Sequence, residues 1–420
     1  MKQKKDHIDL YGLSPGFTKA IKKNQVNSLY HRILFLPSVK SPYYLPNEYQ
    51  NHSQGEIAEY LYLKNPTLTI ESNPFVSSLD EFFCSKSKSH FNYTNYISLF
   101  NLRYIYFRKD IVPAHTSCYT NGDWDWDIVK AGRKIDELYG SDNIFREEYG
   151  SFYLYKDFVP LIHTSNNLLI NNTTLEEMVS LPTYKIGSIM VSENDYKNIK
   201  CCDYSSPIIE YKKINPTKYR VRIHGVRGAF PLLLSEKFSP KWKIYITNNL
   251  LLKKEDLPSN VHGTYKVEEN NIENQASQEE LFDFINNGWI TTLNNSDIQF
   301  VSKKFHNTVQ NDNLLNGIFY ETFEIMNNIF GSNIKLLEQE KAQHYIANDY
   351  ANLWILDTEN LCSSNFSKNG FCVKNADGSY SYELIIEYYG QKIFYIGLLI
   401  GIIGFLGIVI VYSILWIRRK

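Results

Sequence analysis

Hydrophobic and polar residues alternate most regularly along residues 215–246 of the chain. The apolar positions of the first run are Tyr219, Val221 and Ile223, and Lys218, Arg220 and Arg222 separate them. An alternation of period two indicates a half-buried strand. A turn, HGVRG, and two further runs around 230–234 and 242–246 follow it. The segment is therefore predicted to form a β-meander with one face in a core.

Residues 27–165 mix strand and helix patterns. The apolar run Ile33–Leu36 indicates a buried strand, and strands are also predicted over 96–111 and 150–160. The stretch between the last two, residues 121–140, has apolar positions at helical spacing and ends at a glycine. We expect an α/β domain here, preceded by an irregular lead-in over residues 1–26.

From about residue 180 the pattern changes to short strands separated by turn residues. A polar stretch interrupts this pattern at about 265–300, and strand patterns return at 344–357 and 380–389. Residues 180–390 are therefore predicted to form a β-sandwich with an insertion, of jelly-roll or galactose-binding-like type. The expected fold class is α+β: an α/β domain, a β-sandwich and one C-terminal transmembrane helix.

The C-terminal segment Ile393–Ile417 contains 25 residues without a charge. At 1.5 Å per residue it can cross the hydrocarbon core of a bilayer. The basic tail at 418–420 is expected to stay in the cytoplasm, which places residues 1–392 outside it. The predicted location is the cell membrane, single-pass, with the bulk extracytoplasmic. No export signal is visible in residues 1–25. Either the bulk is cytoplasmic behind a tail anchor, or a preceding span comes from a longer precursor or a partner.

Composition excludes some classes of function. The net charge is −1, from 44 basic and 45 acidic residues, so nucleic acid is not an expected partner. No CxxC, HxH or HExxH pattern occurs, and we expect neither a metal nor a cofactor. Cys362 and Cys372 flank a short polar loop and are predicted to form a disulfide. Cys84 and Cys118 could also pair, whereas the adjacent Cys201 and Cys202 are not expected to bond to each other.

Polar and aromatic residues gather at two predicted strand ends. The candidate ligand-binding residues are Glu236, Trp242, Asn348, Asp349 and Trp354, with Ser235 and Asn352 beside them. Carbohydrate sites combine flat rings with amide and carboxylate groups, but a structural polar cluster that closes a sandwich has the same composition. Both interpretations stay open, and no residue is predicted to be catalytic.

Residues 123–127, DWDWD, contain two DxD patterns. A DxD can hold a divalent metal on the diphosphate of a sugar nucleotide, because hard cations prefer carboxylate oxygen. The same acids also suit the N-terminus of a helix, which is the interpretation we favour.

Seven segments in order resemble the C-terminal extracytoplasmic region and last span of YfhO-type membrane proteins. They are RILFLP, LFNLRYIYFRKDI, FYLYKDFVPLIH, residues 215–246, VQNDNLLNG, HYIANDYANLWIL and EYYGQKIFYIGLLIGIIGFLG. The layout is similar to that of arabinofuranosyltransferase-like fold-C glycosyltransferases, whose many spans come before this region and carry the catalytic acid. This chain differs because its one predicted span is the last.

The resemblance implies a membrane-anchored glycan-binding or positioning region that belongs to, or partners, a fold-C glycosyltransferase and is not catalytic alone. Its expected partners are the membrane, a cell-envelope glycan or lipid-linked sugar, and an upstream multi-span protein. The alternatives are a structural or adhesive surface protein and, with Asp123, Asp125 and Asp127 on a metal, a transferase.

Overall fold

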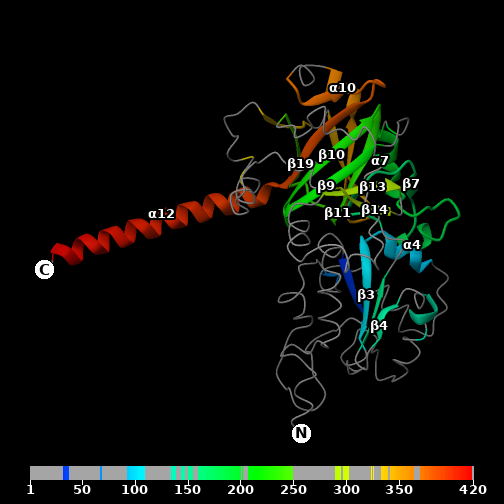
Figure 1. Ribbon diagram of the computed structural model, residues 1–420, viewed down its shortest axis with the longest axis horizontal. Helices are drawn as coiled ribbons and strands as arrows, with labels where there is room; N and C mark the ends of the chain where they lie inside the picture. The colour runs from blue at the N-terminus through cyan, green and yellow to red at the C-terminus, as the bar shows by residue number, and fades with distance from the viewer. Residues whose placement is uncertain are drawn as a thin grey trace, which may run out of the picture.

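A computed structural model gives the arrangement of the chain (Figure 1). It describes residues 32–36, 67–68, 92–108, 133, 135–138, 143–146, 150–154, 159–199, 201, 207–248, 289–294, 297–301, 323, 325, 333–338, 341–363 and 369–418. Within these residues the strands form three sheets, of five, eight and six strands. The fold is mostly β, with short helices and one long C-terminal helix.

The N-terminal sheet is mixed. Its order is β2 (Thr67–Leu68), β1 (Arg32–Leu36), β3 (Leu102–Arg108), β5 (Gly150–Leu154) and β4 (Asn143–Arg146). β1 runs parallel to β2 and β3, whereas β5 is antiparallel to β3 and β4.

The strand predicted over 96–111 is wrong in its first part. Tyr93–Ser98 form a helix, α4, whose first turn is capped by the Asn92 side chain accepting from the Asn95 N–H at 3.1 Å. Asn101 then adopts a left-handed conformation, with φ of 56°, and β3 begins at the next residue. Asparagine tolerates this conformation, so the chain can change from helix to strand there.

Two larger sheets pack against each other, and we call them together the two-sheet unit. The eight-stranded sheet has the order β14 (Asp297–Val301), β13 (Trp289–Asn294), β9 (Ile208–Asn215), β10 (Lys218–Val226), β19 (Tyr380–Tyr388), β12 (Trp242–Thr247) and β15 (Ile334–Leu336), with β18 (Cys372–Lys374) also on β19. The six-stranded sheet has the order β6 (Ile162–His163), β11 (Ala229–Lys237), β17 (Ala351–Asp357), β16 (Ala342–Ala347), β8 (Ile189–Ser192) and β7 (Leu168–Asn171).

The predicted meander over 215–246 is wrong, although its three strands form. β10 pairs with β9 and β19, β11 crosses to the other sheet and pairs with β17 and β6, and β12 returns to pair with β19 and β15. Gly225 and Gly228, at φ of 69° and 73°, make the turn at which the chain leaves the first sheet. Consecutive strands therefore face each other across the core.

That core contains side chains from both sheets. Examples are Val221 and Ile386 from the eight-stranded sheet and Leu232 and Leu356 from the six-stranded one, each 0% exposed. A second cluster joins Leu34 and Ile105 of the N-terminal sheet to Met190 of β8 and to helix α6 (Leu175–Met178). The described residues thus do not separate an N-terminal α/β domain from the rest.

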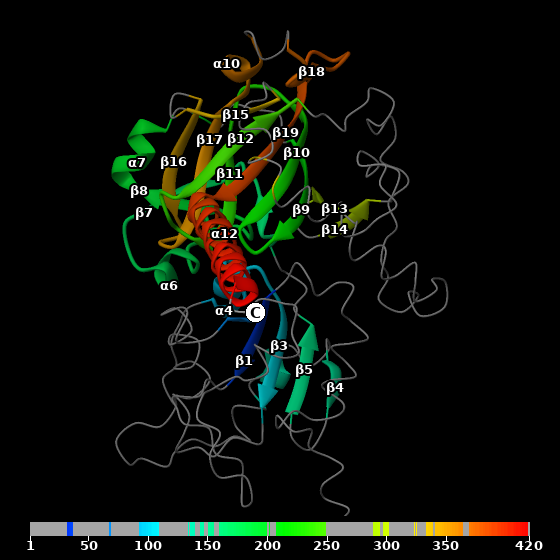
Figure 2. The same ribbon diagram turned by 90° about the vertical axis from the view of Figure 1, so that its left-hand side faces the viewer.

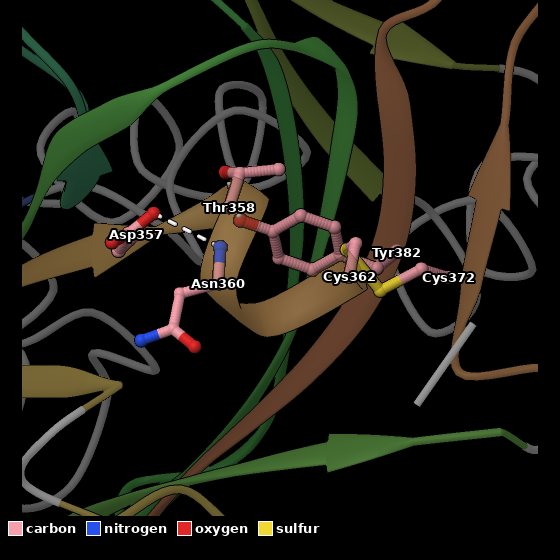
Figure 3. Close-up of a disulfide and its surroundings, with 6 residues drawn as sticks. All are labelled: Asp357, Thr358, Asn360, Cys362, Cys372 and Tyr382. Carbon is pink, nitrogen blue, oxygen red and sulfur yellow. Dashed lines mark hydrogen bonds between the residues drawn. A yellow bond between two sulfur atoms is a disulfide. The ribbon is translucent and has the colours of Figure 1, made fainter. Parts of the chain in front are cut away.

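Helices α7 (Glu193–Asn198) and α10 (Thr358–Ser363) follow β8 and β17. The cysteine of α10, Cys362, is joined to Cys372 of β18 by a disulfide (Figure 3). Beside it the hydroxyl groups of Thr358 and Tyr382 lie 3.1 Å apart, so this end of the unit is held by a covalent and a polar contact together.

The outer face of the eight-stranded sheet carries buried charges, so β10 is not half-buried as predicted. Arg220 Nη2 lies 2.6 Å from Glu383 Oε1, and Arg222 Nε donates to Glu383 Oε2 at 3.3 Å. The three side chains are no more than 2% exposed. A carboxylate on the neighbouring strand β19 makes this burial possible, since buried charges require partners.

The last strand continues directly into the C-terminal helix, α12 (Tyr389–Arg418), with no residue between them. It is the one described helix that is long and apolar enough to cross a membrane, and it begins four residues before the predicted span at Ile393. Most of its large apolar side chains from Ile393 onward are exposed, and the helix extends away from the sheets (Figure 1).

The junction between β19 and α12 is tightly packed. The Tyr389 N–H donates to the Lys241 carbonyl at 2.8 Å, and Lys392 Nζ donates to the Tyr245 hydroxyl at 2.9 Å and lies 3.8 Å from Glu387 Oε2. These contacts fix the start of the helix to the eight-stranded sheet.

Candidate functional site

The polar groups predicted at the end of β11 form a connected cluster around Glu236. Arg32 of β1 donates through Nη2 to Glu236 Oε2 at 3.1 Å, and the Tyr219 hydroxyl donates to Oε1 at 3.2 Å. The Glu236 side chain is 24% exposed, against 8% for Arg32. Because a carboxylate can accept about four hydrogen bonds, Glu236 keeps acceptor capacity on its solvent side.

Arg32 also ties the N-terminal sheet to the two-sheet unit. Its guanidinium donates to the Ser235 carbonyl at 2.6 Å and to the Phe100 carbonyl at 3.0 Å. Burial is the largest single effect and alone would lower its pKa, but Glu236, Tyr350 and Tyr219 together outweigh it and the pKa is raised. Burial and the same carboxylate raise the pKa of Tyr219 well above its usual value. Arg32 is thus charged and Tyr219 neutral.

Asn352 of β17 links Glu236 to an aromatic group. Its amide nitrogen donates to the Glu236 carbonyl at 2.8 Å, while its oxygen accepts from the Ser239 N–H at 3.1 Å. The same oxygen lies 3.1 Å from His344 Nε2. An amide oxygen only accepts, so Nε2 carries the imidazole proton and Nδ1 is the acceptor nitrogen.

The His344 ring contacts two aromatic rings, those of Trp354 and Phe238. It lies parallel to Trp354, with centroids 4.5 Å apart and planes at 9°, and Phe238 lies 5.0 Å away. Burial lowers the pKa of His344 to about 4, although the hydrogen bond that it donates to Asn352 acts in the opposite direction. The imidazole is therefore neutral at neutral pH. His344 and Phe238 are partly exposed, and Trp354 lies beneath them at 2%.

We call this set the Glu236–His344 cluster. Its members are Arg32, Tyr219, Glu236, Phe238, His344, Asn352 and Trp354. At its surface it offers a carboxylate, a neutral imidazole and a phenyl ring, which are groups that can accept hydrogen bonds and contact an apolar face.

The two tryptophans predicted to face a sugar are core residues. Trp242 is 6% exposed, and its ring contacts Tyr219 at 6.1 Å and Tyr388 at 5.4 Å. Trp354 is covered by His344. Stacking of a pyranose on either indole would require these rings to reach the surface.

Asn348 and Asp349 form the turn between β16 and β17, both in the left-handed conformation. The Asn348 side chain accepts from the Met190 N–H at 2.9 Å, and Asp349 accepts from the Asn171 amide at 2.7 Å. Desolvation raises the pKa of Asp349 against that hydrogen bond. Asn348 and Asp349 thus bind the turn to β8 and β7. Glu236 and Trp354 belong to a different set of contacts, which runs through Asn352 and His344.

Sequence reasoning did not identify Arg32 or His344. Arg32 lies 204 residues before Glu236, and nothing local marks their contact. His344 had a signal: a turn at Asn348 and Asp349 fixes the register of the hairpin, and that register pairs His344 with Trp354.

The remaining predictions concern the DWDWD segment, the other cysteines and metal binding. The DWDWD segment, Cys84 and Cys118 lie outside the described residues. Cys201 is disulfide-bonded. Within the described part of the chain, no group of three or more His, Cys, Asp or Glu could hold a metal ion.

Comparison with known proteins gives no match: no family model, no curated protein and no solved structure matches this chain. The features that bear on function are therefore the long apolar helix α12 and the Glu236–His344 cluster.

Proposed function

We propose that this chain is a membrane-anchored, extracytoplasmic module that binds or positions a cell-envelope glycan or lipid-linked sugar. In this proposal it belongs to, or partners, a fold-C membrane glycosyltransferase of the YfhO or arabinofuranosyltransferase-like type, and it is not catalytic alone. The proposal includes the finer fold assignment, with the two-sheet unit as a jelly-roll or galactose-binding-like sandwich and the N-terminal sheet as the core of an α/β region.

The extracytoplasmic location is supported at both ends of α12. Arg418 is the last helical residue and two basic residues follow it, whereas Lys392 at the other end is engaged by Glu387 and Tyr245. An excess of free basic charge after the span favours a cytoplasmic C-terminus. The disulfide of α10 suits an oxidising compartment.

A membrane-impermeant protease added to intact cells tests the orientation. We expect digestion of the part that precedes α12. Protection of that part, together with access to the short C-terminal tail, would place the bulk in the cytoplasm and remove the glycan from its reach.

The observation that carries the binding proposal is the Glu236 carboxylate. Arg32 and Tyr219 hold it in one orientation while its side chain stays 24% exposed. A fixed carboxylate can accept from vicinal sugar hydroxyls with little loss of side-chain entropy. His344 Nδ1 adds an acceptor, and the edge of Phe238 adds an apolar contact for the CH groups of a pyranose.

Calorimetric titration of cell-envelope glycans into the full chain in nanodiscs tests this role. We expect Glu236→Gln and His344→Ala each to weaken binding by about tenfold, the effect of one lost hydrogen bond to a charged or fixed group. Glu193→Gln, which changes an exposed carboxylate on α7, is the control and should bind as the unchanged chain does. If no glycan binds, or if Glu236→Gln binds unchanged, the proposal fails.

One observation favours the alternative of a structural or adhesive surface protein. Trp242 and Trp354 lie in the core, which is the arrangement expected of a cluster that only closes the two sheets. Under that alternative, Glu236→Gln lowers the free energy of unfolding and no glycan binds to any variant. Under the glycan proposal, the unchanged chain binds a glycan, and His344→Ala weakens that binding about tenfold while it remains folded.

A further inference from the structure

We infer that the loop between β11 and β12 lies in the headgroup layer of the membrane and binds anionic phospholipid. The loop and its flanks carry Lys237, Lys241 and Lys243, and all three lysines are exposed. We call this set the basic loop. The inference needs α12 to span a bilayer, but it does not depend on glycan binding.

The position of the basic loop follows from the junction. The Lys241 carbonyl accepts from the Tyr389 N–H at 2.8 Å, so the loop is bonded to the first residue of α12. The uncharged part of the helix begins at Ile393, four residues or about 6 Å further along its axis. The headgroup layer on one side of a bilayer is about 5 to 8 Å thick. The basic loop therefore lies at the depth of the phosphates.

A second contact supports the same placement. The Phe323 ring lies 4.7 Å from the ring of Tyr395, which is in the second turn of α12. The part of the chain that precedes the helix thus reaches the span at more than one point. In the view in which the helix points towards the reader, β19 runs into its start and β12 lies close by (Figure 2).

The charges of the described residues around the basic loop favour an anion. Glu236, next to Lys237, is paired with Arg32, and Glu387, on the strand beside Lys243, lies close to Lys392. The exposed lysines are therefore not neutralised by these two carboxylates. Flexible ammonium groups near a membrane surface attract anionic headgroups, each by roughly fivefold in binding constant.

Photo-crosslinking of the full chain in nanodiscs tests the inference. Headgroup-labelled phosphatidylglycerol and phosphatidylcholine are compared, and the crosslinked peptides are mapped by mass spectrometry. We expect the peptide that spans 237–243 to crosslink more to phosphatidylglycerol than to phosphatidylcholine. In the Lys237→Gln, Lys241→Gln variant, which keeps Lys243, that preference should fall by about fivefold for each lysine removed.

A charge-matched control uses Lys197 and Lys374, both exposed. Lys197 is on α7, on the other side of the two-sheet unit from α12 (Figure 1), and Lys374 pairs with Tyr380 at the start of β19, about 26 Å from the helix. Lys197→Gln, Lys374→Gln should keep the preference. Equal yields from the two lipids, no crosslink at 237–243, or an undiminished preference in the basic-loop variant would each overturn the inference.

Discussion

The Glu383 carboxylate is the most consequential single charge to remove from the two-sheet unit. It lies on β19, is 0% exposed, and contacts Arg220 and Arg222 of the neighbouring strand. Glu383→Gln keeps the shape of the side chain but removes the negative charge that the two guanidiniums share.

The expected loss follows from the depth of the site. Removal of one partner of a buried ion pair costs about 3 to 5 kcal/mol, because the remaining charge stays desolvated. A double-mutant cycle with Arg220→Met isolates the contact at 2.6 Å, and we expect a coupling energy of about 2 to 3 kcal/mol. The same cycle on the exposed pair Glu193 and Lys197, at 2.8 Å, should give about 0.5 kcal/mol or less.

Denaturant unfolding of the full chain in detergent micelles provides the measurement. Trp242 and Trp354 lie in the core between the sheets, so their fluorescence reports the loss of that core. A Glu383–Arg220 coupling energy no larger than that of the exposed pair would show that burial adds nothing to the contact.

Three further predictions concern the pH response, the junction and the disulfide. Because burial lowers the pKa values of His344 and His163 to about 4, the unfolded chain binds their protons first, and the free energy of unfolding should fall as pH decreases from 6.5 to 4. His344→Gln should make that part of the profile shallower in denaturant titrations at each pH, with the His163 contribution left in place. Gly390→Ala should destabilise the chain by about 1 to 2 kcal/mol, because its Cβ would lie 2.6 Å from a tyrosine ring, whereas Gly397→Ala, with nothing within 4 Å, should leave the thermal midpoint unchanged; equal midpoints would contradict this. Replacing Cys362 and Cys372 with serine should cost about 2 to 3 kcal/mol in denaturant unfolding, and an unchanged midpoint would show that the loop needs no bridge.

Local patterns predicted the strands but not their partners. The alternation over 215–246 correctly indicated three strands, yet β11 belongs to the opposite sheet from β10 and β12. Alternation reports which faces of a strand are buried, and a strand that crosses a sandwich has the same pattern as one that turns back within a sheet. The C-terminal apolar helix was predicted to within four residues at its start, because a long uncharged run is typical of a helix that can cross a membrane.

The sequence pointed to Glu236 and Trp354 but not to Arg32 and His344, for a related reason. From the sequence alone, Arg220 and Arg222 are expected to be exposed to solvent. Their burial depends on the contact with Glu383, which is distant in the sequence. Trp354 next to Asn352 is equally typical of a sugar site and of a core edge, and in the structure the ring of His344 stacks on the buried indole of Trp354. Contacts between residues far apart in sequence leave no local signal.

The absence of a linker between β19 and α12 has a mechanical consequence. Tension on the span enters the two-sheet unit through the last residue of a strand that is hydrogen-bonded to β10 on one side and β12 on the other. A pull along β19 loads both ladders in shear, so many hydrogen bonds must fail together instead of opening one at a time. With α12 across a bilayer, a change in bilayer thickness that tilts the helix would also rotate the eight-stranded sheet and move Glu236 relative to the headgroups, because no linker separates β19 from α12.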